Sequence, residues 1–378
     1  MKIAHFCPFA PHRCGMYETV ADIIRAERKL GHQAELIDIG LTGEGNRIGQ
    51  EDRGVKAHGY ARATDADIFV VSGGVEERFL RTTKQPLVHI FHGRPRSSFL
   101  ADLREGDVPG PYDLMVKRMA QPRWKLGITL WAKHLPYHAL VLPPGKLRAT
   151  SAPPLDLSQF SPEGIRHEFA GPGLHILVAD AWRDDWDPYE VLHALAALPA
   201  SLPFQIHVYA ARDINPTSTW QHVFRALKRL GRLGEVKGVM FGFDEVLRGA
   251  DLVVSGHAIA TRVVREACAV GTPVVSQLGC QGALWQYLPT HEDMKEEIEE
   301  AVFAVGRDPM RYRAAAQEAS LAFDSIGIAR ELVGFYQEVL GAEAAAKAPE
   351  PPQAREETTS RCDGRGHGKC SGSCRIGA

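Results

Sequence analysis

Two hydrophobic patterns, one typical of buried strands and one typical of helices, alternate along the chain. This alternating series occurs twice, once in each half of the sequence. Short runs that are almost continuously apolar, such as KIAHFC (2–7) and LHILVAD (174–180), are typical of parallel strands buried on both faces. Between such runs, apolar residues recur every three or four positions, as in the helix predicted to begin at Gly15 and end at Gly31. Strands that alternate with helices predict an α/β protein with doubly wound sheets.

The pattern divides the chain into two Rossmann-like domains. The strands of the first are predicted at 2–7, 34–39, 67–73 and 86–93. A segment rich in proline, glycine and serine (151–173) is typical of a linker. The strands of the second are predicted at 174–180, 204–210, 236–242, 251–255 and 272–277. Its helices are predicted near 189–198, 219–230, 292–305, 309–322 and 326–340.

We therefore predict a first domain at 1–160 and a second domain with closing helices at 161–341. After Gly341 the composition changes to alanine, proline and glutamate, so 342–378 is predicted to be a disordered linker and tail. Ligands of such sheets bind beyond the carboxyl ends of the strands. A deep cleft between the two domains is therefore the expected site.

The composition is typical of a globular protein and predicts the cellular compartment. Hydrophobic residues make up 44% of the 378 residues, charged residues make up 24%, and the net charge is −2, as in an ordinary globular protein. The start MKIAHFCPF does not have the basic flank and long apolar core of a signal peptide. No apolar run approaches the roughly 20 residues that span a bilayer, so no transmembrane segment is expected. Seven cysteines are too few for a disulfide scaffold, so reduced thiols and a cytoplasmic location are expected.

Positive charge gathers in the segment 94–148. It holds ten lysines and arginines against four acidic residues, with aromatic residues such as Trp131 and Tyr137 among them. Such a stretch predicts a site for an anionic or aromatic partner. The alternative is a solvated rim with a few aromatic residues of the core.

One carboxylate stands out in the stretch TRVVREACAVGTPVVS (261–276). The stretch predicts a short helix that ends at Gly271 and leads into a buried strand. Glu266 lies in that helix between Arg262 and Arg265. It is either a ligand-binding group or one half of an i,i+4 ion pair with Arg262.

Four segments together resemble family 4 glycosyltransferases of the GT-B fold, and they cover nearly all of residues 1–340. The segments are PFAPHRCGMYETVADIIRAERKLGHQAELID, PLVHIFHGRP, LPPGKLRATSAPPLDLSQFSP and GADLVVSGHAIATRVVREACAVGTPVVS. Their order and spacing carry the resemblance, because no single segment is specific. The resemblance implies transfer of a sugar from a nucleotide-diphosphate sugar, usually with retention at the anomeric carbon and without a metal.

The resemblance also implies roles for individual residues around the donor. In the family, the glutamate at the place of Glu266 accepts hydrogen bonds from the ribose hydroxyls, a task that suits a group that only accepts. Thr261, Arg262 and Val263 lie where the helix start would hold the diphosphate. Gly15 has the place where backbone and diphosphate come close, although an ordinary turn into a helix is the alternative.

Two histidines are the candidate catalytic residues. His92 matches the His-Gly that follows a buried strand in the family, where it would hydrogen-bond the sugar or polarise the acceptor side; the alternative is a structural histidine. The family's second glutamate is replaced by Ala258, and the adjacent His257 partly stands in for it. We do not expect a general base, since the leaving phosphate is thought to take the acceptor proton in retaining enzymes of this fold.

The second domain also departs from the family near its first strand. Arg183 supplies the expected arginine, shifted by one position, whereas Asp187 falls near the expected lysine. A carboxylate cannot neutralise a diphosphate, so Arg262, Arg265 or a residue of the first domain would have to compensate. These departures imply an unusual donor or a loss of activity.

The tail has a separate candidate site. Its spacing C-x4-H-x2-C-x3-C offers four candidate zinc ligands, namely Cys362, His367, Cys370 and Cys374. The spacing is not that of a standard finger, and the alternative is a disordered, glycine-rich tail with free thiols.

Three function hypotheses follow from these observations, and the first has a general and a sharper version. The leading one is a glycosyltransferase whose acceptor is a glycan, a lipid headgroup or a small molecule. A sharper version glycosylates a modified base in DNA, because basic and aromatic residues occur together in 94–148 and the tail is basic. The second hypothesis is an inactive GT-B binding module, and a phosphorylase on the same fold is a weaker third hypothesis.

Overall fold

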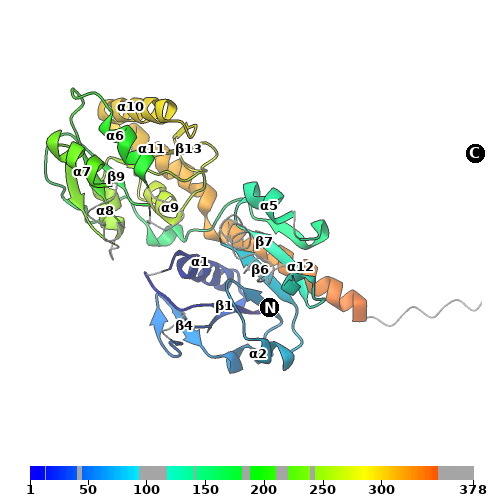
Figure 1. The fold of residues 1–378 in the computed structure, drawn as a ribbon. Helices are drawn as coiled ribbons and strands as arrows, with labels where there is room; N and C mark the ends of the chain where they lie inside the picture. The colour runs from blue at the N-terminus through cyan, green and yellow to red at the C-terminus, as the bar shows by residue number, and fades with distance from the viewer. Residues whose placement is uncertain are drawn as a thin grey trace, which may run out of the picture.

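The chain forms two α/β halves, each built around its own sheet (Figure 1). This computed structural model describes residues 1–12, 14–40, 45–92, 117–139, 142–180, 188–209, 220–238 and 243–347.

The first sheet contains eight described strands in the order β3-β4-β2-β1-β5-β6-β7-β8. They are β1 (Lys2–Cys7), β2 (Gln33–Asp38), β3 (Glu51–Asp52), β4 (Val55–His58), β5 (Ile68–Val71), β6 (Leu87–Phe91), β7 (Trp124–Thr129) and β8 (Leu147–Ala149). All neighbouring pairs are parallel except β3 and β4. The helices of this half are α1 (Gly15–Lys29), α2 (Glu77–Arg81) and α5 (Leu135–Ala139).

Both faces of the first sheet are covered, which explains its continuous apolar strands. Ile3 of β1 packs into a cluster with Ile23 of α1, whereas its neighbour Ala4 packs into a second cluster with Leu80 of α2. Alternate residues of a strand point to opposite faces, so a strand covered on both sides is apolar throughout.

The second sheet has the order β11-β10-β9-β12-β13-β14, and all its pairs are parallel. Its strands are β9 (Leu174–Val178), β10 (Phe204–Val208), β11 (Leu233–Val236), β12 (Leu252–Val254), β13 (Val274–Gln277) and β14 (Trp285–Tyr287). The helices that follow are α6 (Tyr189–Ala196), α7 (Trp220–Arg229), α8 (Phe243–Gly249), α9 (Arg262–Ala269), α10 (His291–Arg307), α11 (Pro309–Ser320) and α12 (Ser325–Lys347). Short 3₁₀ helices occur as η1 (Tyr60–Asp65), η2 (Ala132–His134), η3 (Pro144–Lys146), η4 (Leu157–Gln159) and η5 (Leu321–Phe323).

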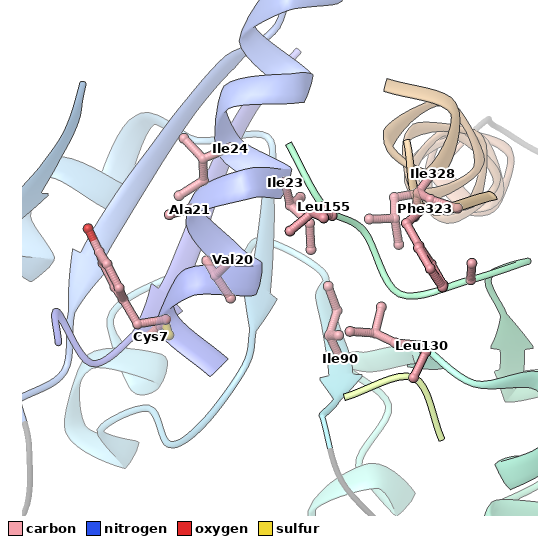
Figure 2. Close-up of a cluster of buried hydrophobic side chains, with 14 of the residues drawn as sticks. Cys7, Val20, Ala21, Ile23, Ile24, Ile90, Leu130, Leu155, Phe323 and Ile328 are labelled. Atoms are coloured by element: carbon pink, nitrogen blue, oxygen red, sulfur yellow. The ribbon is translucent and has the colours of Figure 1, made fainter. Parts of the chain in front are cut away.

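The chain crosses between the halves twice, and the two crossings lie together. Leu155 N–H donates to the carbonyl of Phe323 at 2.7 Å, and Ser325 N–H donates to the carbonyl of Leu155 at 3.0 Å. The last helix, α12, then packs against α1 of the first half. Figure 2 shows Ile23 of α1 beside Leu155, with Phe323 and Ile328 nearby. One hydrophobic cluster therefore contains residues of both sheets and of both crossings.

Most predicted elements are confirmed to within a few residues, and three differences stand out. The strand predicted to begin at 236 instead begins at Leu233 and ends at Val236 as β11, and the predicted portion 239–242 lies outside the described residues. The pattern did not predict β3, β4, β7, β8 or β14. Helix α12 continues through Gly341 to Lys347, beyond the predicted start of the linker. The domain limits at 160 and 341 remain predictions.

Within the described ranges, no helix is both long enough and apolar enough to cross a bilayer.

Candidate active site

The start of α9 carries the first part of the candidate site. Thr261 is the N-cap residue, but its side chain does not cap the helix. Its Oγ1 is buried and has no hydrogen-bond partner among the described atoms. The first N–H groups of a helix have no partner within the helix, and the helix dipole makes this end attractive to anions. The helix start and the Thr261 hydroxyl therefore offer donors that an anionic group can accept.

Glu266 lies one turn further along α9. Its Oε1 accepts a hydrogen bond from Arg262 Nε at 2.6 Å, so the i,i+4 pair is formed. Its Oε2 receives no hydrogen bond from the part of the chain that the structure describes. Burial raises the pKa of Glu266, although Arg262 and Arg265 act in the opposite direction. The side chain is 14% exposed, so one carboxylate oxygen is left to bind a ligand.

Arg262 connects the two halves. Besides Glu266, its guanidinium donates to Asp22 of α1, whose side chain is fully buried. Arg25 donates to the other oxygen of Asp22 at 2.5 Å. Burial by itself would lower the pKa of Arg262, but Asp22, Glu266 and Glu18 outweigh it and raise this pKa. The arginine is therefore a fixed cation between the buried carboxylate of Asp22 and the partly buried carboxylate of Glu266.

His92 follows β6 and lies near Arg265 of α9. Its Nε2 is buried and has no partner among the described atoms. Burial, with smaller contributions from Arg265 and His5, lowers the pKa of His92 to about 3. Burial and Arg262 likewise lower the pKa of Arg265 to about 9. His92 is thus a neutral imidazole at neutral pH, suited to hydrogen bonding and unsuited to act as a cation.

His257 lies in the turn after β12, at the carboxyl edge of the second sheet. Its backbone carbonyl accepts from Ser276 Oγ at 2.6 Å. Its Nε2 lies 3.9 Å from Oδ1 of Asp180, a buried residue that follows β9. Sequence reasoning did not select Asp180. The available signal was an acidic residue directly after the apolar run LHILVA.

Gly15 begins α1 and is exposed. A Cβ at this position would meet no described atom within 4 Å, so the described part of the chain leaves open space there. The predicted close approach of a ligand stays a prediction.

Comparison with solved structures identifies the fold of this chain. No family model and no curated protein matches the chain. Sucrose-phosphate synthase from Thermosynechococcus elongatus is similar in structure, with a TM-score of 0.66 and 13% identity over 90% of this chain and 100% of that one. Anabaena Alr3699/HepE, solved with UDP-glucose, has a TM-score of 0.61 and 14% identity over 89% and 100%. An alpha-glucosyltransferase solved with UDP and a 13-mer DNA has a TM-score of 0.57 and 13% identity over 90% and 100%.

The chain has the GT-B fold.

The two halves of this GT-B protein also meet through the described part of the basic segment. Lys133 Nζ of the first half donates to the carbonyl of Gly279 in the second half at 3.1 Å. Trp131 is partly buried, and its Nε1 has no partner among the described atoms. Tyr137 is 56% exposed, so it is not a core residue.

Several predicted residues lie outside the described part of the GT-B chain. They are Arg183, Asp187, the portions 94–116 and 140–141 of the basic segment, and the tail residues Cys362, His367, Cys370 and Cys374. Within the described ranges, no three His, Cys, Asp or Glu side chains are grouped so that they could hold a metal ion.

Proposed function

We propose that this protein is a glycosyltransferase that moves a sugar from a nucleotide-diphosphate sugar to an acceptor, with retention and without a metal. The observation that carries the proposal is the Glu266 carboxylate, with one oxygen unpaired among the described residues, beside the start of α9. The likeness to a protein solved with UDP-glucose supports a uridine nucleotide as the first donor to test.

In this proposal the donor nucleotide binds along α9. Glu266 Oε2 accepts hydrogen bonds from the ribose diol, since a carboxylate is an acceptor with no competing donor. The diphosphate accepts hydrogen bonds from the start of α9 at Thr261, Arg262 and Val263, as free N–H groups at a helix start favour anions. The same groups stabilise the charge that develops on the leaving phosphate.

The candidate catalytic residues then contact the sugar. His92 is neutral and donates or accepts one hydrogen bond, while His257 occupies the place next to the missing glutamate at Ala258. Neither residue is proposed as a general base. The leaving phosphate takes the proton of the acceptor hydroxyl, and the protein contributes mainly by orienting the two substrates.

The acceptor is proposed to bind the first half, around residues 94–148. The likeness to a glucosyltransferase solved with UDP and DNA favours a nucleobase as the second candidate acceptor, beside a glycan or a lipid headgroup. Stacking on Trp131 or Tyr137 would suit either a base or a sugar ring.

A thermal-shift panel tests the donor site. The wild type and Glu266→Ala are heated with UDP, GDP, ADP, CMP and the matching nucleotide-sugars. A ligand that binds only the folded state raises its stability, by about 2.7 kcal/mol at a concentration of about 100 times Kd. We expect one nucleotide to raise the Tm of the wild type by several degrees, and Glu266→Ala to lose most of this rise.

Glu35→Gln is the matched control. Glu35 is also an ion-paired carboxylate, bonded to Arg62 at 2.6 Å, but it lies on β2 of the first sheet, away from α9. Its variant should keep the full shift. A flat panel with the wild type would reject the donor site and favour the inactive binding module instead.

A further inference from the structure

Two histidines of the second half meet on a surface away from the candidate active site. His193 lies in α6 and is exposed, and His291 is the first residue of α10 and is partly exposed. Their Nδ1 atoms are 3.4 Å apart, and their ring centroids are 4.6 Å apart. Tyr189 stacks on His193 with a centroid distance of 6.0 Å, which limits the movement of that ring. The two histidines are 98 positions apart in the sequence, so the packing of α6 on α10 brings them together.

Both rings are carried by firmly packed helices. Leu192 of α6 and Met294 of α10 are buried in one hydrophobic cluster. Thr290 caps the start of α10, because its hydroxyl accepts a hydrogen bond from the N–H of Asp293 at 3.4 Å. The backbones of both histidines are therefore held in place, as a metal site requires of its ligands.

The distance between the two Nδ1 atoms fits a tetrahedral zinc ion. Zinc binds imidazole nitrogens at about 2.0–2.1 Å, so two nitrogens on one tetrahedral ion lie about 3.3–3.4 Å apart. The same 3.4 Å is long for a direct hydrogen bond between the rings, because bonds donated by N–H groups cluster at about 2.9–3.0 Å. The spacing therefore suits a shared metal ion better than it suits a direct hydrogen bond.

Both imidazoles can present an electron pair at Nδ1. A neutral imidazole carries one proton, which lies on either of its two nitrogens. Within the described ranges, neither Nε2 atom of His193 and His291 has a hydrogen-bond partner in the protein, so water can accept the proton there. With the protons on Nε2, both Nδ1 atoms are available as metal ligands.

The charged residues around the pair favour a cation. The start of α10 is the positive end of the helix dipole, which by itself opposes a cation there. Glu292 and Asp293 in the first turn of α10 and Glu190 in the first turn of α6 supply negative charge at the same place. Lys295, one turn after His291, carries the opposite charge. The balance of these neighbours is therefore negative.

The pair lies on the face of the second sheet opposite to α9. Val274 of β13 packs in the cluster that contains residues of α9, and its neighbour Val275 packs in the cluster of α6 and α10. Alternate residues of a strand point to opposite faces. Figure 1 shows α6 and α10 side by side, on the side of the second half that is turned away from the first half. An ion bound there does not occupy the candidate donor site.

We propose that His193 and His291 bind one Zn²⁺ ion through their Nδ1 atoms, with water in the two remaining positions, and that the ion fastens the start of α10 to α6. Within the described ranges, no third His, Cys, Asp or Glu completes a metal-binding group, so the site has two protein ligands. Imidazole suits zinc, whereas magnesium prefers oxygen ligands. The inference is independent of the proposed sugar transfer.

Calorimetric titration with ZnCl₂ tests the site on the full chain after removal of metals with EDTA. We expect the wild type to bind one more zinc ion than either His193→Ala or His291→Ala. The Kd of that ion should be on the order of 10 µM, because two ligands supply about half of the binding free energy of a site with four. Cysteine thiols also bind zinc, so the measured quantity is the difference between the wild type and each variant, which keep the same thiols.

His222→Ala is the matched control. His222 is also an exposed histidine of the second half, but it lies on α7. This variant should bind as many zinc ions as the wild type does. Magnesium in place of zinc should give no difference between the wild type and the two variants.

Thermal unfolding tests whether the ion joins the two helices. At about 100 µM zinc we expect the Tm of the wild type to rise by about 2 °C more than the Tm of either variant, since only the folded state brings the two rings together. An equal response to zinc in all three proteins would mean that the ion does not fasten α10 to α6.

Three binding results would overturn the inference. Equal zinc stoichiometry in the wild type and His193→Ala would mean that the two rings form a hydrogen bond only. Loss of the ion in one variant and its retention in the other would mean that the histidines do not share it. A Kd weaker than about 1 mM for the extra ion would mean adventitious binding to an exposed imidazole.

Discussion

Some histidine side chains of this protein are buried away from water. His138 of α5 is 2% exposed, stacks on Phe91 with ring centroids 4.2 Å apart, and has no hydrogen bond to either ring nitrogen among the described residues. Burial lowers its pKa to about 4. His89 is similar, since burial lowers its pKa to about 3. These histidines remain neutral in the folded protein.

The neutral histidines make stability depend on pH. The ordinary pKa of histidine is 6.5, so between pH 6.5 and 4 the unfolded chain binds a proton at His138 that the folded protein does not bind. The free energy of unfolding must therefore fall as the pH falls through this window. For His138 alone we expect a loss of about 2 kcal/mol between pH 7 and pH 5.

Urea unfolding of the wild type and His138→Phe at both pH values measures this contribution. The variant, which cannot titrate at this position, should lose about 2 kcal/mol less than the wild type on acidification. His222→Phe on α7 is the control, because His222 is exposed, and its pH dependence should equal that of the wild type. Equal losses in all three proteins would show that burial of His138 does not oppose its protonation.

Individual residues also show how much of the candidate site could be predicted from the sequence. The pair of Arg262 and Glu266 is four positions apart on one helix, so both the ion pair and the ligand role were available as hypotheses. The contact of Arg262 with Asp22 could not be predicted from the sequence, because nothing in the sequence near either residue indicates the other. Asp180 was missed for the same reason, since its partners Ser255 and Gly256 are 75 and 76 positions away.

Among the elements, those with a strong periodic pattern were predictable and those without one were not. Helix α1 is amphipathic and ends before Gly31, whose φ of 87° favours glycine. Strand β7 escaped prediction because Lys125 and Gly127 interrupt its apolar run. Gly127 has a tertiary reason, since a Cβ there would lie 2.8 Å from the ring of Phe91. Strand β14 has only three residues, too few for a pattern.

The last helix gives a prediction at this scale. Leu332 of α12 is fully buried in the cluster shared with α1, whereas Leu321 in the turn before α12 is 65% exposed. We expect Leu332→Ala to lower the free energy of unfolding by about 2–5 kcal/mol and Leu321→Ala to lower it by less than about 0.5 kcal/mol. Denaturant unfolding compares the two variants. Similar losses in both would contradict the packing of α12 on the first half.

In the whole molecule, the two halves are joined by direct contacts as well as by the linker. Leu155 and Phe323 join the two crossings, Arg262 joins α9 to α1, and Lys133 joins the first half to Gly279. The hydrophobic cluster that contains Ile23 of α1 also contains Leu177 of β9. The two halves are therefore expected to stabilise each other.

Differential scanning calorimetry tests this coupling. We expect a single unfolding transition whose calorimetric enthalpy equals its van't Hoff enthalpy, although chains of this size often unfold in steps. Leu155→Ala should move that single transition to lower temperature without splitting it, because Leu155 is fully buried in the shared cluster. Two resolved transitions in the wild type would show that the halves unfold independently.

The sequence by itself determined the class of this protein. A strand buried on one face has apolar residues at every second position, and a strand buried on both faces is apolar throughout. A helix buried on one face has apolar residues every three to four positions. These patterns are local in the sequence. They therefore predicted two doubly wound halves, most strands, and the helix that carries Glu266.

Only the tertiary structure decided which charges neutralise one another and which polar groups are left unpaired. Asp22 and Arg262 are 240 positions apart, and Asp180 meets its turn only because β9 and β12 are neighbours in the sheet. Hydrogen bonds and ion pairs act over a few ångströms in space without regard to separation along the chain. The fold must bring such groups together before their chemistry can be known.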